Sequence, residues 1–95
     1  MTSVSGTAGI SIEQPDAARL KALGVSGWPI WTKAPSTFEW SYDQAEQCYF
    51  LEGRVEVRTA QGAVRIGRGD FVTFPKGLSC TWRVLEAVRK HYRFD

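Results

Sequence analysis

Residues 69–77, Gly-Asp-Phe-Val-Thr-Phe-Pro-Lys-Gly, constrain the fold of this chain more than any other stretch. The side chains of Phe71–Phe74 alternate between two faces, as in a short buried strand. Gly69 supplies backbone dihedrals that other residues avoid, so a turn precedes the strand. Pro75 and Gly77 end the pairing and turn the chain, because proline has no N–H to donate. The stretch therefore predicts a strand held between two sharp turns.

Similar alternating segments recur over the rest of the chain after residue 27. The predicted strands are 28–33, 36–42, 46–51, 54–59, 63–66, 71–74, 79–85 and 87–94. Turn residues separate them, among them Gly53 and the Ala-Gln-Gly sequence at 60–62. Many short strands with turns at regular intervals are typical of an all-β sandwich or barrel.

The N-terminal part of the chain has a different pattern. Residues 1–10 are small, polar and glycine-containing, so we expect a flexible tail, followed by a single domain over residues 11–95. Residues 15–24 predict one short helix that packs against the barrel. Pro15 suits the first helical position, and Gly24 suits the turn that ends the helix.

Composition excludes several classes of protein. The chain is 43% hydrophobic and has a net charge of +2, with basic residues dispersed among acidic ones, so nucleic acid is not an expected partner. The apolar runs are too short to span a bilayer, and no secretory signal pattern opens the chain. We therefore expect a cytoplasmic protein with two reduced cysteines and no membrane partner.

A second segment, residues 46–57, holds Glu46, six residues, Gly53 and then an alternating strand. Together with the Gly-x5-Pro-x-Gly spacing of residues 69–77, it resembles the two signatures of the cupin superfamily, which are small double-stranded β-barrels. Residues 28–31, 48–57, 70–77 and 88–92 look like the compact single-domain cupins grouped with the cupin domain of (S)-ureidoglycine aminohydrolase. This resemblance, which runs over roughly residues 12–94, implies an all-β double-stranded β-helix (jelly-roll barrel) with one short N-terminal helix.

The resemblance also bears on metal binding, because cupins that bind a metal use three histidines and a glutamate. On this chain the first two histidine positions fall on Trp40 and Tyr42, the glutamate on Glu46, and the last histidine on Cys80. A catalytic metal normally has at least three protein ligands, so no standard metal site is expected. A divalent transition metal bound by Cys80, Cys48 and Glu46 is the alternative.

Strand alternation predicts which side chains face the barrel interior. On the last strand, Lys90 and Tyr92 are expected inside and His91 outside, unless a bulge reverses the strand. The predicted interior site consists of Trp40, Tyr42, Glu46, Cys48, Cys80, Trp82, Lys90 and Tyr92.

These residues form either a filled core with a structural Glu46–Lys90 pair or a pocket with aromatic walls around a few polar groups. We favour the pocket, because a buried carboxylate is costly and often marks a functional site. The predicted function is the binding of a small polar metabolite without a cofactor.

Two other functions are open. The resemblance to ureidoglycine aminohydrolase implies a metal-dependent enzyme that releases ammonia from a ureido compound. Alternatively, the chain is an interaction module that acts as a homodimer, which is also the assembly we expect. Trp28 and Trp31 are then candidate interface aromatics, although core packing explains them equally well.

Overall fold

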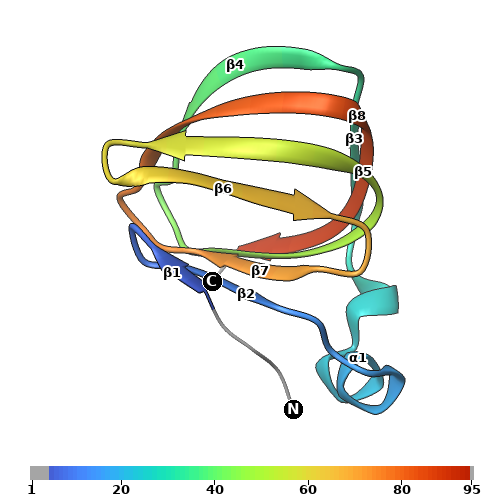
Figure 1. Cartoon of the computed structure of the whole chain (residues 1–95). Helices are drawn as coiled ribbons and strands as arrows, with labels where there is room; N and C mark the ends of the chain where they lie inside the picture. The colour runs from blue at the N-terminus through green and yellow to red at the C-terminus, as the bar shows by residue number, and fades with distance from the viewer. Residues whose placement is uncertain (1–4, 95) are drawn as a thin grey trace.

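Two long antiparallel strands, β5 (Glu46–Thr59) and β8 (Ser79–Phe94), organise the computed structural model, which describes residues 5–94 (Figure 1). They pair along nearly their whole length, from Glu46 opposite Phe94 to Arg58 opposite Thr81. Both strands bend, so that each contributes one half to each of two facing sheets. The interior between these sheets holds the core and the site.

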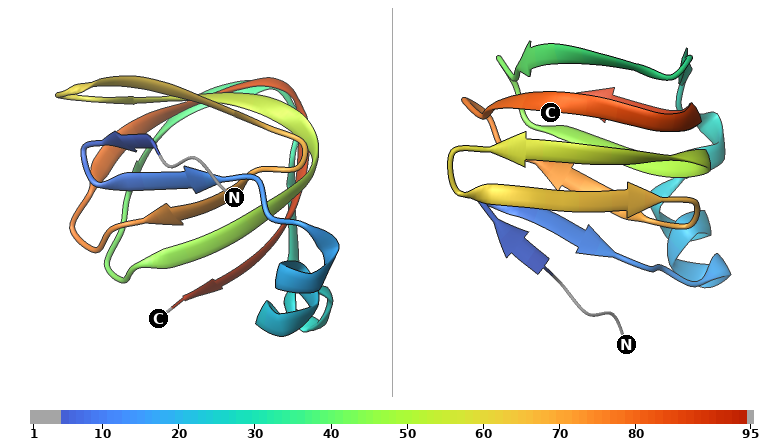
Figure 2. Two further views of the ribbon diagram at one scale, coloured as in Figure 1. Left: turned by 60° about the horizontal axis from the view of Figure 1, so that its bottom comes forward. Right: turned by 45° about the horizontal axis from the view of Figure 1, so that its top comes forward.

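The remaining strands extend the two sheets from these central strands. One sheet has the order β1 (Ser5–Thr7), β2 (Ile10–Glu13), β7 (Phe71–Phe74), first half of β5, second half of β8, β3 (Ile30–Lys33). The other has the order β6 (Gly62–Gly67), second half of β5, first half of β8, β4 (Ser36–Ser41). Figure 2 shows these strands curling around a common interior. The predicted all-β jelly-roll barrel with one short helix is confirmed.

The bend in β5 explains why two separately predicted strands form one continuous strand. The register between β5 and β8 shifts three times between Phe50 and Val55, which marks β-bulges. Gly53, at φ +100°, lies at the centre of this region, and an added Cβ there would lie 2.4 Å from the carbonyl oxygen of Ala87. The bulges bend both strands without ending their pairing. The sequence prediction of a break in each strand was therefore wrong.

The core that supports the site is largely aromatic. Phe74 is fully buried, and its ring stacks on Tyr42 at 4.9 Å between centroids and lies 5.8 Å from the ring of Trp82. Phe50 is also fully buried and stacks on Trp82 at 6.3 Å. Because interiors are close-packed, these contacts fix the orientation of the rings that line the site.

The helical segments are α1 (Ala17–Leu23) and the single 3₁₀ turn η1 (Val25–Gly27). Asp16 caps α1 through its side chain, so Pro15 precedes the cap and is not the first helical residue as the sequence indicated. Gly24, at φ +71°, ends the helix as predicted. No residue of α1 is fully buried, but Leu20 and Leu23 are half-buried, and Arg19 donates to Glu13 of β2, so the helix lies beside the barrel and contacts it (Figure 2). Neither helical segment that the structure describes has the length or apolar character to cross a membrane.

Residues 5–10, which the sequence analysis assigned to a flexible tail, form β1 and the start of β2. Ala8 and Gly9, at φ +55° and +82°, make the two-residue hairpin turn between them. Ile10 is fully buried, and β2 pairs with β7. Composition alone did not predict these strands. They are ordered by pairing with a strand about 60 residues away in the sequence, and not by local propensity. Residues 1–4 of the predicted tail lie outside the described residues.

The contact at Gly53 predicts a specific loss of stability. Gly53 and Gly69 both have positive φ, but an added Cβ meets backbone atoms only at Gly53; at Gly69 nothing lies within 4 Å. We expect Gly69→Ala to cost about 1–2 kcal/mol from backbone strain alone. Gly53→Ala should cost more than about 4 kcal/mol or prevent folding, because it also displaces β8. Urea unfolding of both variants measures this, and equal losses would contradict the role of Gly53 as the contact point of the two strands.

Candidate functional site

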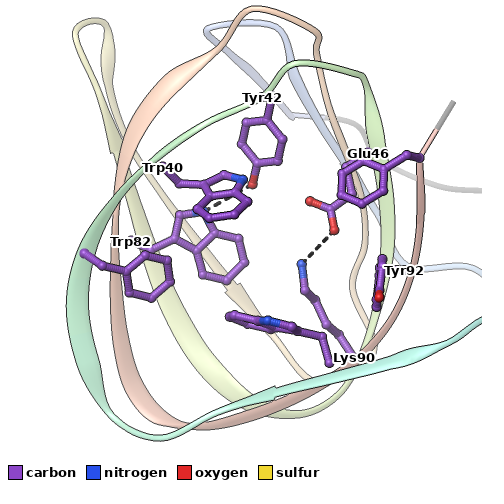
Figure 3. Close-up of a pocket in the computed structure, with 9 residues that line it drawn as sticks. Trp40, Tyr42, Glu46, Trp82, Lys90 and Tyr92 are labelled. Atoms are coloured by element: carbon purple, nitrogen blue, oxygen red, sulfur yellow. Dashed lines mark hydrogen bonds and ion pairs between the residues drawn. The ribbon is translucent and has the colours of Figure 1, made fainter.

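A cavity of about 200 Å³ lies inside the barrel, between residues of β3, β4, β5 and β8 (Figure 3). This volume corresponds to roughly six or seven water molecules. Seven of the nine lining residues are aromatic, and only Glu46 and Lys90 carry a charge. The lining residues are Trp31, Phe38, Trp40, Tyr42, Glu46, Trp82, Lys90, Tyr92 and Phe94.

The ammonium group of Lys90 is the central polar group of the site. The side chain is only 5% exposed, and its Nζ lies 3.1 Å from Oε2 of Glu46. The same nitrogen donates a hydrogen bond to Sγ of Cys48, also at 3.1 Å. A buried ion pair is tolerated only when further hydrogen bonds complete it, and the thiol supplies one here.

Aromatic rings surround the same ammonium group. Nζ of Lys90 lies 4.8 Å from the ring centroid of Trp82, 5.0 Å from that of Trp31 and 5.8 Å from that of Phe50. At these distances the negative faces of the rings attract the cation. The strand pairing produces this arrangement, because Trp31 on β3 and Phe50 on β5 are the direct cross-strand partners of Lys90.

Glu46 has one carboxylate oxygen free to meet a ligand. Oε2 accepts from Lys90, and the neutral thiol of Cys48 also interacts with this carboxylate, whereas no hydrogen bond to Oε1 is found among the described residues. Within those residues every fully buried side-chain nitrogen or oxygen has a partner, so Oε1 must reach the cavity surface. Figure 3 shows the carboxylate pointing into the cavity. The side chain is 7% exposed, so this acceptor is accessible almost only from inside the barrel.

The hydroxyl of Tyr42 lies across the cavity from this carboxylate (Figure 3). It accepts a hydrogen bond from Nε1 of Trp82 at 3.2 Å, and no acceptor for its own proton lies within hydrogen-bonding distance among the described residues. Burial raises the pKa of Tyr42 far above its usual value, and the negative charge of Glu46 raises it further. Tyr42 therefore stays neutral and can donate into the cavity.

The two cysteines do not line the cavity, which corrects the sequence prediction. Cys48 is fully buried and contributes through its contact with Lys90; burial raises the pKa of its thiol to about 12, although the charge of Lys90 opposes the shift. Sγ of Cys80 donates to the carbonyl oxygen of Trp40 at 3.7 Å, and burial raises the pKa of this thiol as well. Both groups are neutral thiols in the neutral pH range.

The other predicted site residues lie where strand alternation places them. Trp40, Tyr42, Glu46, Trp82, Lys90 and Tyr92 all line the one cavity. Trp40 is 48% exposed, so its ring forms part of the cavity rim. His91 is outside the cavity, as alternation predicts, and its Nδ1 lies 2.9 Å from the carbonyl oxygen of Trp28.

Three lining residues are absent from the sequence prediction: Trp31, Phe38 and Phe94. Trp31 was considered as an interface residue, but its ring contacts Lys90 and Trp82. It can be found only when the register of β3 on β8 is known, because Lys90 is its cross-strand partner. Phe94 could have been found from alternation alone, since it lies two residues after Tyr92 on one strand.

The donor set does not fit a metal centre of the cupin type. Within residues 5–94, no three His, Cys, Asp or Glu side chains are grouped so that they could hold a metal ion. Trp40 and Tyr42 stand at the positions that the resemblance assigns to histidines. Lys90 already binds both Glu46 and Cys48, two of the three donors in the alternative soft-metal site. A fixed organic cation therefore faces the carboxylate that a metal would need.

The model of the EutQ-like cupin domain family matches residues 20–92. The chain belongs to this family. A comparison with curated proteins found no match for this EutQ-like cupin domain.

Solved structures show the same fold. The domain is similar to a DUF861-family protein (tm1112) from Thermotoga maritima, with 55% identity, a TM-score of 0.88, and coverage of 90% of this chain and 99% of that one. It is also similar to a putative ethanolamine utilization protein Q from Salmonella typhimurium LT2, with 22% identity, a TM-score of 0.64, and coverage of 94% and 72%. The Clostridium difficile EutQ protein matches with 17% identity and a TM-score of 0.61, over 96% of this chain and 58% of that one. The last two likenesses concern the fold alone.

The Lys90–Glu46 pair predicts strongly non-additive effects on stability. Lys90→Met leaves the charge of Glu46 buried without its partner, so we expect a loss of about 3–5 kcal/mol in the free energy of unfolding. The double variant Glu46→Gln/Lys90→Met removes both charges and should recover most of this loss. Urea unfolding of the single and double variants measures the difference.

A matched control lies on the same two strands. Glu52 and Arg89 form an exposed ion pair at 3.3 Å, so Arg89→Met and Glu52→Gln/Arg89→Met should each change stability by less than about 1 kcal/mol. If Lys90→Met lowers the free energy of unfolding by no more than Arg89→Met does, the buried pair does not constrain the structure.

Proposed function

We propose that this EutQ-like cupin domain binds a small polar metabolite in its barrel cavity, without a metal ion. The observation that carries the proposal is the free Oε1 of Glu46, an acceptor on a side chain that is 7% exposed. Buried polar groups are nearly always paired, so one that opens only into a cavity marks a place for a partner molecule.

The shape and lining of the cavity support this proposal. Aromatic walls with a few convergent polar groups are typical of sites for small molecules. The volume of about 200 Å³ lies below the usual range of roughly 300–1,000 Å³, which favours a ligand of few non-hydrogen atoms. Trp40 and Phe94, at 48% and 47% exposure, offer apolar ring surface at the rim.

A screen of small polar metabolites by thermal shift tests the proposal. We expect discrete compounds to raise the melting temperature of the wild-type domain, because a ligand that binds only the native state stabilises it. The same compounds should have no effect on Glu46→Leu/Lys90→Met, in which the acceptor at position 46 and its ammonium partner are both removed. The control Glu52→Gln/Arg89→Met should respond like the wild type, since this pair is exposed.

Either of two results would contradict the proposal. One is the absence of any stabilising compound in a broad screen of small metabolites. The other is a set of compounds that stabilise the wild type and Glu46→Leu/Lys90→Met equally, because their binding would then not depend on the polar groups of the cavity.

An enzyme related to ureidoglycine aminohydrolase is the alternative function. The spacing of Glu46, Gly53 and the 69–77 segment supports it, whereas the Lys90 ammonium on Glu46 opposes it. Metal analysis of the purified protein, together with an ammonia-release assay on ureido compounds, separates the two functions. The homodimer and the cytoplasmic location are further proposals, for light scattering and cell fractionation to test.

A further inference from the structure

The hydrogen-bonding groups left free in the cavity specify the kind of ligand it accepts. Glu46 offers an acceptor, Oε1, and Tyr42 offers a donor, its hydroxyl proton; the hydroxyl of Tyr92 also lines the cavity. Figure 3 shows the two groups facing one another across the cavity, and no hydrogen bond joins them. A ligand that satisfies both must donate to the carboxylate and accept from the phenol.

Lys90 does not add a free positive charge to this pattern. Its ammonium donates to Glu46 and Cys48 and is otherwise faced by the rings of Trp82, Trp31 and Phe50. The charge of Lys90 is balanced by that of Glu46, so the two together are neutral. Tyr42 stays protonated and supplies no compensating negative charge.

A charged ligand therefore finds no counterion in the cavity. In a space of about 200 Å³, an anion would lie close to the carboxylate of Glu46 and a cation close to the ammonium of Lys90. Either ion would also lose its hydration shell on entering the cavity. This loss is costly unless an opposite charge in the cavity pairs with the ion. An uncharged ligand avoids both penalties and can still satisfy the two free groups.

We propose that the cavity selects an uncharged molecule whose hydroxyl or carboxamide group donates to Oε1 of Glu46 and accepts from the hydroxyl of Tyr42. This inference rests on the proposed binding function and names its ligand class. The hydrocarbon part of the ligand contacts the aromatic walls.

Three probes of similar size and different charge test the selection: propionamide, propionate and propylammonium. The indole Nε1–H signal of Trp82 in ¹⁵N NMR is a suitable readout, because this group donates to Tyr42. We expect propionamide to shift the signal saturably and both charged probes to bind at least about tenfold more weakly, as in sites built around specific hydrogen bonds.

Two hydroxyl deletions, one inside the cavity and one outside it, provide a matched comparison. Tyr42→Phe removes the proposed donor and should weaken propionamide binding by about tenfold or more. Tyr49→Phe removes a hydroxyl on β5 that is not part of the cavity lining, so binding should change by less than about threefold. If Tyr42→Phe does not fold, because Trp82 loses its acceptor, the charge series on the wild-type domain decides alone.

The possible failures are distinguishable. The inference is wrong if propionate or propylammonium binds as tightly as propionamide. It is also wrong if all the cavity ligands found in the metabolite screen are charged. The proposed function survives both results. Uncharged metabolites that shift the Trp82 signal support the inference even if propionamide itself is too small to bind. The complete absence of cavity ligands overturns the inference and the proposed function together.

Discussion

The ion pair between Lys90 and Glu46 is the constraint on which the rest of the interior depends. Two charges removed from water are tolerated only with close pairing and further hydrogen bonds, and here the carboxylate, a thiol and three rings surround one ammonium. The pair also fixes strand register. A slip of β8 by one residue would turn Lys90 outward and place Arg89 or His91 inside without a partner.

The same pair gives the site its chemical character. The resemblance to metal-binding cupins places Glu46 among metal ligands, but in this chain the carboxylate binds the ammonium of its own Lys90. Trp40 and Tyr42 replace imidazoles by groups that pack or donate hydrogen bonds. A barrel that holds its own cation internally has no net charge to offer a ligand. The acceptor of Glu46 and the donor of Tyr42 face one another across it, which supports the proposal of a small uncharged polar ligand.

The sequence predicted the fold and much of the site because both leave local patterns. Glycine and proline spacing located the turns, and alternation placed Glu46, Trp82, Lys90 and Tyr92 toward one interior. Features that depend on distant pairing could not be predicted in this way. Trp31 reaches Lys90 through the register of β3 on β8, and β1–β2 form because β7 is available to pair. Cys80 likewise lies outside the cavity lining, and its thiol donates to the carbonyl oxygen of Trp40 on the paired strand β4.

Side-chain NMR of the lysine ammonium groups tests whether the buried Lys90–Glu46 pair forms in solution. In the arrangement described here, the Nζ protons of Lys90 are protected from water and lie close to two indole rings. We expect a slowly exchanging ammonium signal for Lys90, with nuclear Overhauser contacts to the rings of Trp31 and Trp82. A Lys90 signal that exchanges as fast as those of exposed lysines, with no contact to either ring, would contradict this expectation.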